Sequence, residues 1–272
     1  MLLLSLTAAA APVPEGSLLN SPDRPWQVEP VAEIGFLAPF SNSYQSGKEG
    51  TEFNYVEEGG QDNLFLVARL SLDVRWSERN AVTFLYQPLD VRTEQVANRD
   101  LVLDNLTYPT GTPINFRYGF DFYRLSYSRD VLEDPNKELA FGGSIQIRNA
   151  TINTTSSDGE LRATTRDIGP VPVLKTRGRF DSESGAWWGF EVDGFYAPIK
   201  YLNGGKSDVV GAIADASLRA GVTLEHGIEP FLNLRYITGG SEGTSTTPDP
   251  GKDGYNRNWL HLGTLTIGFL VR

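Results

Sequence analysis

Few side chains in this 272-residue sequence are spaced as a recognisable nucleophile, general base or metal-ligand set. The chain has no cysteine, which excludes a thiol nucleophile and a thiolate-bound metal. Neither of its two histidines, His226 and His261, has a serine and an acid at a spacing that indicates a catalytic triad. A pair of carboxylates could still hydrolyse peptides, and several acids lie in polar segments that we predict to be loops. These acids are Glu57, Glu58, Asp62, Asp104, Asp158 and Asp253.

Acids in loops usually serve solvation, so we predict a non-enzymatic protein with no catalytic residue. The glycine pairs at 59–60, 142–143, 204–205 and 239–240 lack the strand-to-helix context of a phosphate-binding loop. No cluster of metal ligands is evident, and we expect no metal and no cofactor. The net charge of −10 opposes binding to nucleic acid, since no basic surplus is available to neutralise phosphates.

The elements that must position these side chains are strands, because apolar and polar residues alternate with a period of two. The alternation is clear over 63–76, 139–149, 187–198, 209–224, 230–238 and 259–271. It is weaker over 30–41, 81–94, 113–129 and 164–180. Near Phe122/Tyr123 and Gln87/Pro88 it slips by one residue, which predicts a β-bulge at each place.

The connections between these strands are alternately short and long. Turns rich in Gly, Asn, Asp and Pro lie near 76–80, 132–137, 181–185 and 225–229. Longer polar segments lie near 42–60, 95–112, 151–163, 200–208 and 239–257. This pattern predicts an all-β, up-and-down antiparallel sheet of about ten strands, with 8–12 possible, that closes into a barrel and so removes its edges.

The composition of the two faces favours a transmembrane barrel with short periplasmic turns and longer extracellular loops. The charged face carries both signs, which the core of a soluble barrel would not tolerate, and strands of 9 to 11 residues or more suit a bilayer. We therefore predict a lumen in which cations outnumber carboxylates, and an aromatic girdle on the apolar face. The predicted lumen-facing charges are Glu33, Arg69, Asp73, Arg75, Arg117, Asp121, Arg148, Lys175, Arg177, Arg179, Glu191, Asp193, Asp215, Arg219 and Arg235. The predicted girdle is Trp76, Tyr118, Phe180, Trp188, Tyr196, Tyr236 and Trp259.

The beginning of the chain predicts export. Residues 1–10 are apolar and contain alanines in A-x-A spacing, as in a signal peptide. Residues 11–29 are rich in proline and indicate an extended periplasmic leader, so that the barrel domain occupies 30–272.

Together, the signal-like start, the alternating strands and the final strand at 260–272 resemble bacterial outer-membrane β-barrel proteins as a class. In that class the last strand alternates apolar residues and ends in an aromatic residue. Here Leu265, Ile267, Phe269 and Val271 keep the alternation, but the chain ends in Val-Arg. The resemblance implies location in the cell outer membrane, and contact with outer-membrane lipids, lipopolysaccharide and the barrel-assembly machinery.

We therefore expect either a narrow channel, which its cationic wall would make anion-favouring, or a structural barrel with surface loops. The solute of such a channel is not indicated by the sequence. Two other classes stay open at this point: an outer-membrane enzyme acting on lipid A or peptides, and a secreted soluble barrel that binds a small ligand.

Overall fold

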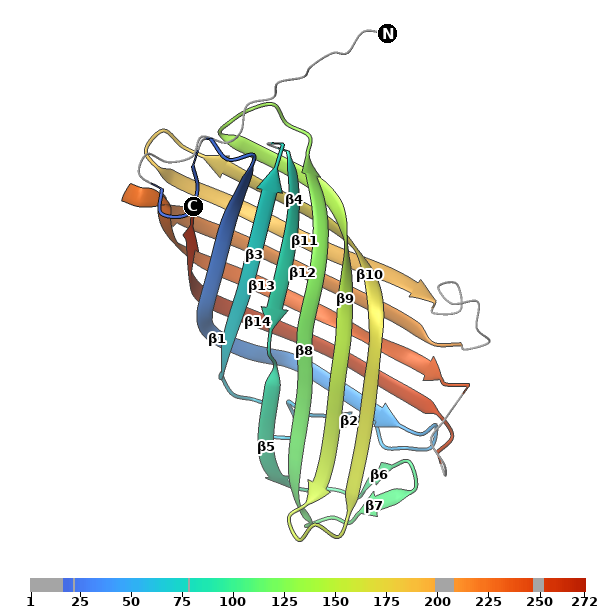
Figure 1. Ribbon diagram of the computed structural model, residues 1–272. Helices are drawn as coiled ribbons and strands as arrows, with labels where there is room; N and C mark the ends of the chain where they lie inside the picture. Colours follow the sequence, from blue (N-terminus) through green and yellow to red (C-terminus); the bar gives the residue numbers. More distant parts are fainter. Residues whose placement is uncertain (1–16, 22, 78, 199–207, 247–251) are drawn as a thin grey trace.

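A computed structural model describes residues 17–21, 23–77, 79–198, 208–246 and 252–272 (Figure 1). The described chain is all-β, with one short 3-10 turn, η1 (Glu225–Gly227). Its strands are β1 (Trp26–Ser46), β2 (Phe53–Asn54), β3 (Phe65–Trp76), β4 (Asn80–Gln87), β5 (Asp90–Val96), β6 (Leu101–Leu103), β7 (Leu106–Tyr108), β8 (Pro113–Asp130), β9 (Lys137–Ser156), β10 (Arg162–Asp181), β11 (Ala186–Pro198), β12 (Val210–Val222), β13 (Ile228–Thr244) and β14 (Tyr255–Val271). No helix among the described residues is long and apolar enough to cross a membrane.

The main sheet closes on itself because β1 pairs with both β3 and β14. Between them each strand pairs antiparallel with its neighbours in the chain. β4 and β5 form two halves of one barrel strand, since both pair with β8 in a single register from Asn80↔Arg129 to Val96↔Pro113. The prediction of a closed, antiparallel barrel of about ten strands is thus confirmed.

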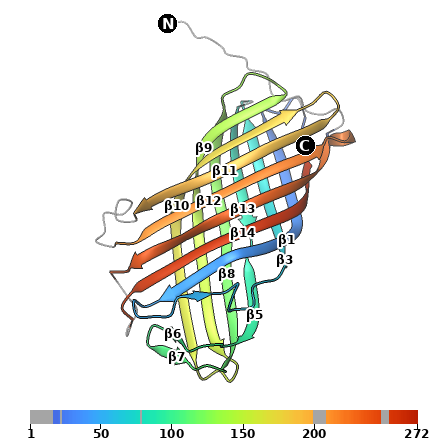
Figure 2. The same ribbon diagram turned by 180° about the vertical axis from the view of Figure 1, so that it is seen from behind.

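The strands are strongly tilted (Figures 1 and 2). Following paired residues around the barrel from Trp26 leads through Asn80, Phe141 and Val192 and returns to β1 at Ala38. This offset is the stagger that closing a tilted sheet requires. A barrel of this strand number is narrow, so side chains can fill its interior.

The two ends of the barrel differ. At one end, which we name the turn end, the chain enters at β1, finishes at Arg272 and makes the short connections 77–79, 131–136, 182–185 and 223–227 (Figure 1). The opposite loop end carries the longer connections 47–64 and 97–112, the latter with the β6–β7 hairpin. The loop predicted at 151–163 is mostly strand, because β9 and β10 continue to Ser156 and from Arg162.

Around the middle of the barrel the outer face is an apolar belt, as a lipid-facing surface requires. On β3, for example, Leu66 and Leu70 point outward and are exposed, whereas Val67 and Arg69 are buried inside. The belt includes the exposed side chains Ile34, Phe36, Leu66, Leu70, Leu72, Phe84, Leu125, Ile145, Leu174, Val192, Leu218, Leu232, Leu234, Leu265, Ile267 and Phe269.

Toward the loop end the polarity of the two faces is exchanged. On β8 the inward positions are Arg124 and Ser126 within the belt, but Phe116 and Tyr118 beyond it, all of them buried. The outward positions change in the opposite sense, from exposed Leu125 to polar residues such as Asn115 and Arg117. β8 thus passes from a wall with its apolar side outward to one with its polar side outward.

This exchange explains why the two predicted β-bulges are wrong. The register of β8 with β9 is unbroken past Phe122 and Tyr123, and that of β4 and β5 with β8 is unbroken past Gln87. At this point the apolar residues change from the outer face to the inner face, while the strand pairing continues unbroken. A register shift lies instead in β1, between Pro39 and Ser41, and changes the inward positions from odd residues such as Leu37 to even ones such as Tyr44.

The predicted signal-like segment 1–10 lies outside the described residues, as does the first part of the predicted leader 11–29. The end of that leader is already barrel wall, since β1 begins at Trp26 and pairs there with Trp76 of β3. The barrel therefore starts earlier than the predicted residue 30.

The position of the membrane boundary can be tested on β8 with two outward-facing residues. Leu125→Arg, within the belt, should destabilise the barrel in lipid vesicles by about 2–4 kcal/mol, whereas Asn115→Arg, beyond the exchange point, should change stability by no more than about 0.5 kcal/mol. Unfolding by denaturant in vesicles measures both free energies. Equal costs would place the boundary elsewhere.

Candidate functional site

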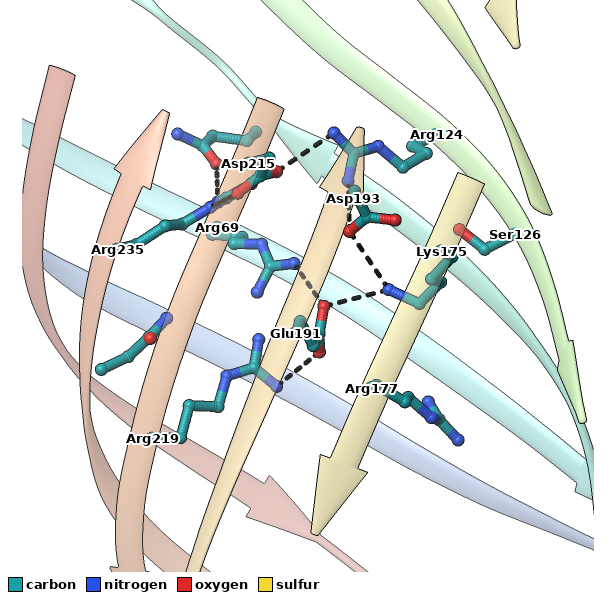
Figure 3. Close-up of polar contacts among 12 residues, drawn as sticks. Arg69, Arg124, Ser126, Lys175, Arg177, Glu191, Asp193, Asp215, Arg219 and Arg235 are labelled. Atoms are coloured by element: carbon teal, nitrogen blue, oxygen red, sulfur yellow. Dashed lines mark hydrogen bonds and ion pairs between the residues drawn. The ribbon is translucent and has the colours of Figure 1, made fainter. Parts of the chain in front are cut away.

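The charged side chains of the lumen form a connected set of ion pairs, which we name the lumen network (Figure 3). Glu191 of β11 is its centre: Oε1 binds Arg219 of β12 at 2.9 Å, and Oε2 binds Lys175 of β10 at 3.1 Å. Oε2 also lies 3.5 Å from Arg69 of β3. β3 and β11 are on opposite walls, with four barrel strands between them on either side, so this contact spans the lumen.

A second group of charges lies beside this centre. Asp193 binds Arg124 at 2.8 Å and Lys175 at 3.4 Å. Asp215 accepts from Arg124 at 3.1 Å and from both Nε and Nη2 of Arg235. Arg124 comes from β8, while Asp193 and Asp215 come from β11 and β12, so these contacts also cross the interior (Figure 3).

Glu33 of β1 joins the network on its other side. One carboxylate oxygen accepts from Arg69 at 2.8 Å and Arg219 at 3.2 Å. The other accepts from Asn233 at 2.7 Å and Thr266 at 2.8 Å. A carboxylate with four donors is well compensated for its loss of water, which is the condition for burying a charge.

Closer to the turn end a further layer of ion pairs continues the network. Glu138 binds Arg75 at 2.7 Å and also Nε of Arg177, and Arg177 reaches Asp73 on the opposite wall at 2.6 Å. Arg179 of β10 binds Glu229 of β13 at 2.7 Å, and its guanidinium lies 4.2 Å from the centre of the Trp187 ring. Side chains from many strands thus occupy this end of the lumen.

The ion-paired interior is balanced in charge across the described residues, contrary to the prediction that cations outnumber carboxylates. Its cations are Arg69, Arg75, Arg124, Lys175, Arg177, Arg179, Arg219, Arg235 and Arg272. Its carboxylates are Glu29, Glu33, Asp73, Glu138, Asp181, Glu191, Asp193, Asp215 and Glu229.

The loop end is closed by different chemistry. Connections 47–64 and 97–112 fold inward, and their apolar side chains pack against the inner face of β8 and β14. We name this cluster the loop-end plug, formed by Phe53, Tyr55, Leu101, Leu103 and Tyr108 with Ile114, Phe116, Tyr118, Leu260 and Leu262.

Aromatic contacts and tyrosine hydrogen bonds help to fix the loop-end plug. The ring of Phe116 stacks on Phe53 at 5.0 Å and meets Tyr55 edge-on at 5.5 Å. The Tyr108 hydroxyl donates to the Thr154 carbonyl at 2.8 Å, and burial raises the pKa of Tyr108 to about 12. Figure 2 shows the β6–β7 hairpin drawn across this end of the barrel.

Most of the residues predicted to face the lumen lie in it. Exceptions are Arg117 and Asp121, which are outward-facing positions of β8 beyond the exchange point. The side chain of Arg148 lies outside the described part of the structure, although its backbone pairs with Phe122 and Gly169. Glu33, Arg69, Asp73, Arg75, Lys175, Arg177, Arg179, Glu191, Asp193, Asp215, Arg219 and Arg235 all take part in the lumen network or its continuation.

Six charged members of the interior were missed. Arg124 follows the apparent parity slip in β8, which obscured its inward orientation. Glu29 was assigned to the leader, while Glu138, Asp181, Glu229 and Arg272 lie at the edges of predicted turns or at the end of the last strand. If alternation had been assumed to continue unbroken through 113–129, Arg124 would have been predicted to face the lumen.

The predicted aromatic girdle divides between the two ends of the belt. Trp76, Phe180 and Trp188 lie toward the turn end, with Phe180 stacked on Trp188 at 4.4 Å. Tyr196 and Tyr236 are exposed toward the loop end, where Trp259 occupies an outward position of β14.

Tyr118 corrects the girdle prediction. It is only 2% exposed and lies inside the barrel, where its hydroxyl donates to Asn258 at 3.0 Å. The cause is again the exchanged polarity of β8, whose apolar residues face inward beyond the belt.

The histidines lie far from each other along the barrel. His226 is in η1 at the turn end with a positive φ of 62°. His261 is on the outer face of β14 toward the loop end, where Nδ1 lies 2.8 Å from the Tyr236 hydroxyl and 3.0 Å from that of Thr238. His261 thus lies beside two hydroxyl groups, whereas His226 lies in a tight turn.

Four of the six loop acids make contacts at the loop end. Glu58 binds Arg99 at 2.7 Å, Asp104 accepts from Ser46 at 2.8 Å, and Asp253 accepts from the Lys48 backbone at 2.7 Å. Asp158 accepts from Ser156 at 2.5 Å. Glu57 and Asp62 belong to the same inward-folding connection as Glu58. Across the described residues, no group of three or more histidines and acids is arranged to hold a metal ion.

Comparison with known proteins gives a likeness of fold alone. No family model and no curated protein sequence matches the chain. Among solved structures it is similar to the outer membrane protease OmpT from Escherichia coli, with 12% identity, 90% of this chain and 96% of that chain covered, and a TM-score of 0.46. It is also similar to the Pseudomonas putida toluene transporter TodX, with 8% identity, 93% and 91% covered, and a TM-score of 0.32. The β domain of the Bordetella autotransporter BrkA gives 11% identity, 90% and 98% covered, and a TM-score of 0.32.

The energetic importance of the lumen network can be measured by removing its centre. Glu191→Gln keeps the shape but leaves Arg69, Lys175 and Arg219 without that carboxylate, and should destabilise the barrel by about 3–5 kcal/mol. Glu133→Gln is the matched control, because Glu133 pairs with Arg79 on the surface and is 72% exposed. It should cost no more than about 1 kcal/mol in the same unfolding experiment. A similar loss of unfolding free energy in the two variants would show that the charges of the lumen network are exposed to water.

Proposed function

We propose that this chain is a bacterial outer-membrane β-barrel with a closed lumen, and that it serves as a structural, non-enzymatic barrel that presents its loop end at the cell surface. Three features support the membrane location: the apolar belt, the aromatic residues at both of its margins, and an interior of ion pairs. Short connections at one end and long ones at the other give the orientation, with the turn end in the periplasm.

The observation that carries the closed state is the lumen network. Its pairs join opposite walls at several levels, as in Arg69 with Glu191 and Arg177 with Asp73. An ion moving through would have to separate buried charges from partners that replace their hydration, which is costly. The loop-end plug forms a second, apolar barrier on the same path through the lumen. A structural barrel therefore accounts for the interior better than the narrow channel that the sequence also allowed.

The balance of charge weakens the anion-favouring version further. Such a channel needs a surplus of cations facing its pore, whereas the described interior supplies a carboxylate for each cation. The enzymatic alternative gains no support from the positions of His226 and His261, since base catalysis needs these side chains near a nucleophile and an acid.

Conductance in planar bilayers tests the proposal. The purified, refolded barrel is expected to give no current steps at high salt, and a variant lacking the hairpin at 100–109 is also expected to give none, because the lumen network remains. Steps from the unmodified chain would contradict the closed state. Steps only after removal of the hairpin would assign the seal to the plug instead of the network.

A further inference from the structure

The barrel wall divides toward the loop end and exposes an edge of β10. β10 and β11 are paired as far as Leu174↔Gly194, after which β10 continues beside β9 alone and β11 beside β12 alone. Figure 2 shows the two strands diverging beyond this point. Within the described part of the chain, no strand pairs with this side of β10 over residues 162–173. We name residues 162–169 on this side the open edge of β10.

The chain covers the matching division on the other side of the barrel with a strand of its own. β1 leaves β3 after Leu37, and β2 then pairs with β1 at Ser43 and Tyr44. The backbone N–H of Tyr55 also donates to the Asn42 carbonyl at 2.8 Å. The open edge of β10 is therefore not imposed by the shape of the barrel, since the corresponding edge of β1 is covered.

One lysine contact and two prolines show which backbone groups point out of β10 on this side. The Thr164 carbonyl accepts from the Lys252 ammonium group at 3.4 Å, so it points away from β9. In an antiparallel strand the N–H and C=O of one residue point to the same side, and the side alternates along the strand. The even-numbered residues thus direct their backbone groups to the open edge. Pro170 and Pro172 belong to this set and have no N–H, as is typical of an edge strand.

The prolines separate the part of this edge within the belt from the part beyond it. They pair with Ile145 and Ile147 of β9, whose side chains are exposed on the outer face. Arg166 lies four residues beyond the nearer proline, or about 13 Å along the strand. The part within the belt lacks N–H donors, whereas the part beyond it offers the N–H and C=O groups of Arg162, Thr164 and Arg166. Such an edge is a template for an added strand.

The side chains beside the open edge favour an acidic partner. Arg162 and Arg166 are exposed on the outer face, and neither takes part in an ion pair among the described residues. Of the acids in the preceding turn, Asp158 accepts from the backbone N–H of Glu160 at 3.0 Å and so serves the turn itself. A second copy of the chain fits poorly, because antiparallel pairing of two such edges about Thr164 would place arginines opposite each other, which is destabilising.

We propose that the open edge of β10 binds an extended peptide segment of another protein, which adds as a strand and carries acidic side chains on its outer face. Backbone hydrogen bonds to Arg162, Thr164 and Arg166 supply affinity, with the Thr164 carbonyl exchanging Lys252 for a peptide N–H. The two guanidinium groups supply selectivity for carboxylates. The position of this partner outside the cell rests on the proposed orientation of the barrel.

A synthetic peptide tests the proposal. The probe is a fluorescent heptapeptide of alternating valine and glutamate with blocked ends, and fluorescence anisotropy measures its binding to the full refolded barrel in detergent. Arg162→Glu with Arg166→Glu should weaken binding by about tenfold or more, and should make the barrel prefer the matching valine and lysine peptide, since two cross-strand charge pairs change sign. Thr164→Pro removes an N–H from the open edge, so it should weaken binding of the glutamate peptide.

Amide hydrogen exchange examines the open edge directly. In the free barrel the amides of Thr164 and Arg166 should exchange faster than that of Thr165, which points toward β9, and the glutamate peptide should slow them. Protection of both amides in the free barrel would show that the edge is already paired and would overturn the proposal.

The control is Arg257→Gln, which removes another loop-end arginine, near Glu52 and Glu242, and should leave binding unchanged. Equal binding of the glutamate and lysine peptides by the parent, or unaltered binding by Thr164→Pro, would contradict the added strand. Dimerisation of the barrel that Thr164→Pro abolishes would assign the edge to a second copy instead. These measurements do not involve conductance, so their failure would leave the closed structural barrel untouched.

Discussion

The pairing of charges across the lumen is the interaction on which the rest of this barrel depends. An interior enclosed by ten strands holds many arginines and carboxylates, and none can be stable there unless a partner replaces its water. Glu33, Asp215 and Glu191 each bind donors from more than one strand, so the positions of distant strands become coupled. The register that closes β1 on β14 is therefore consistent with, and supported by, the chemistry of the interior.

In the proposed membrane location, the exchange of polarity along β5, β8 and β9 follows from the surroundings of the barrel. Within lipid, the outer face must be apolar, and the narrow interior receives the polar side chains. Outside lipid the same strands meet water, so polar residues such as Asp90 face outward and Phe116 faces the plug. One continuous hydrogen-bonded wall thereby serves both a membrane barrel and a water-exposed barrel, without a change in register.

Alternation with a period of two was sufficient to predict the fold and most of the lumen, since strand geometry alone decides which side chains share a face. It was insufficient where the environment changes along a strand. Tyr118, Arg117 and Asp121 were assigned to the wrong faces because their polarity was taken to report inside and outside directly. No feature of the sequence indicates the register shift near Phe40. The partners of Arg124, Asp193 and Asp215, come from strands that are distant in the sequence.

Closure by two unlike layers also bears on where the protein can interact. The lumen network is held by charge and resists desolvation, while the loop-end plug is held by apolar burial of Tyr55 and its neighbours. A solute would have to displace both, and the two respond to different conditions, since salt weakens charge pairing and strengthens apolar burial. A solute passing along the lumen would therefore meet two barriers of different physical origin, one of paired charges and one of buried apolar side chains.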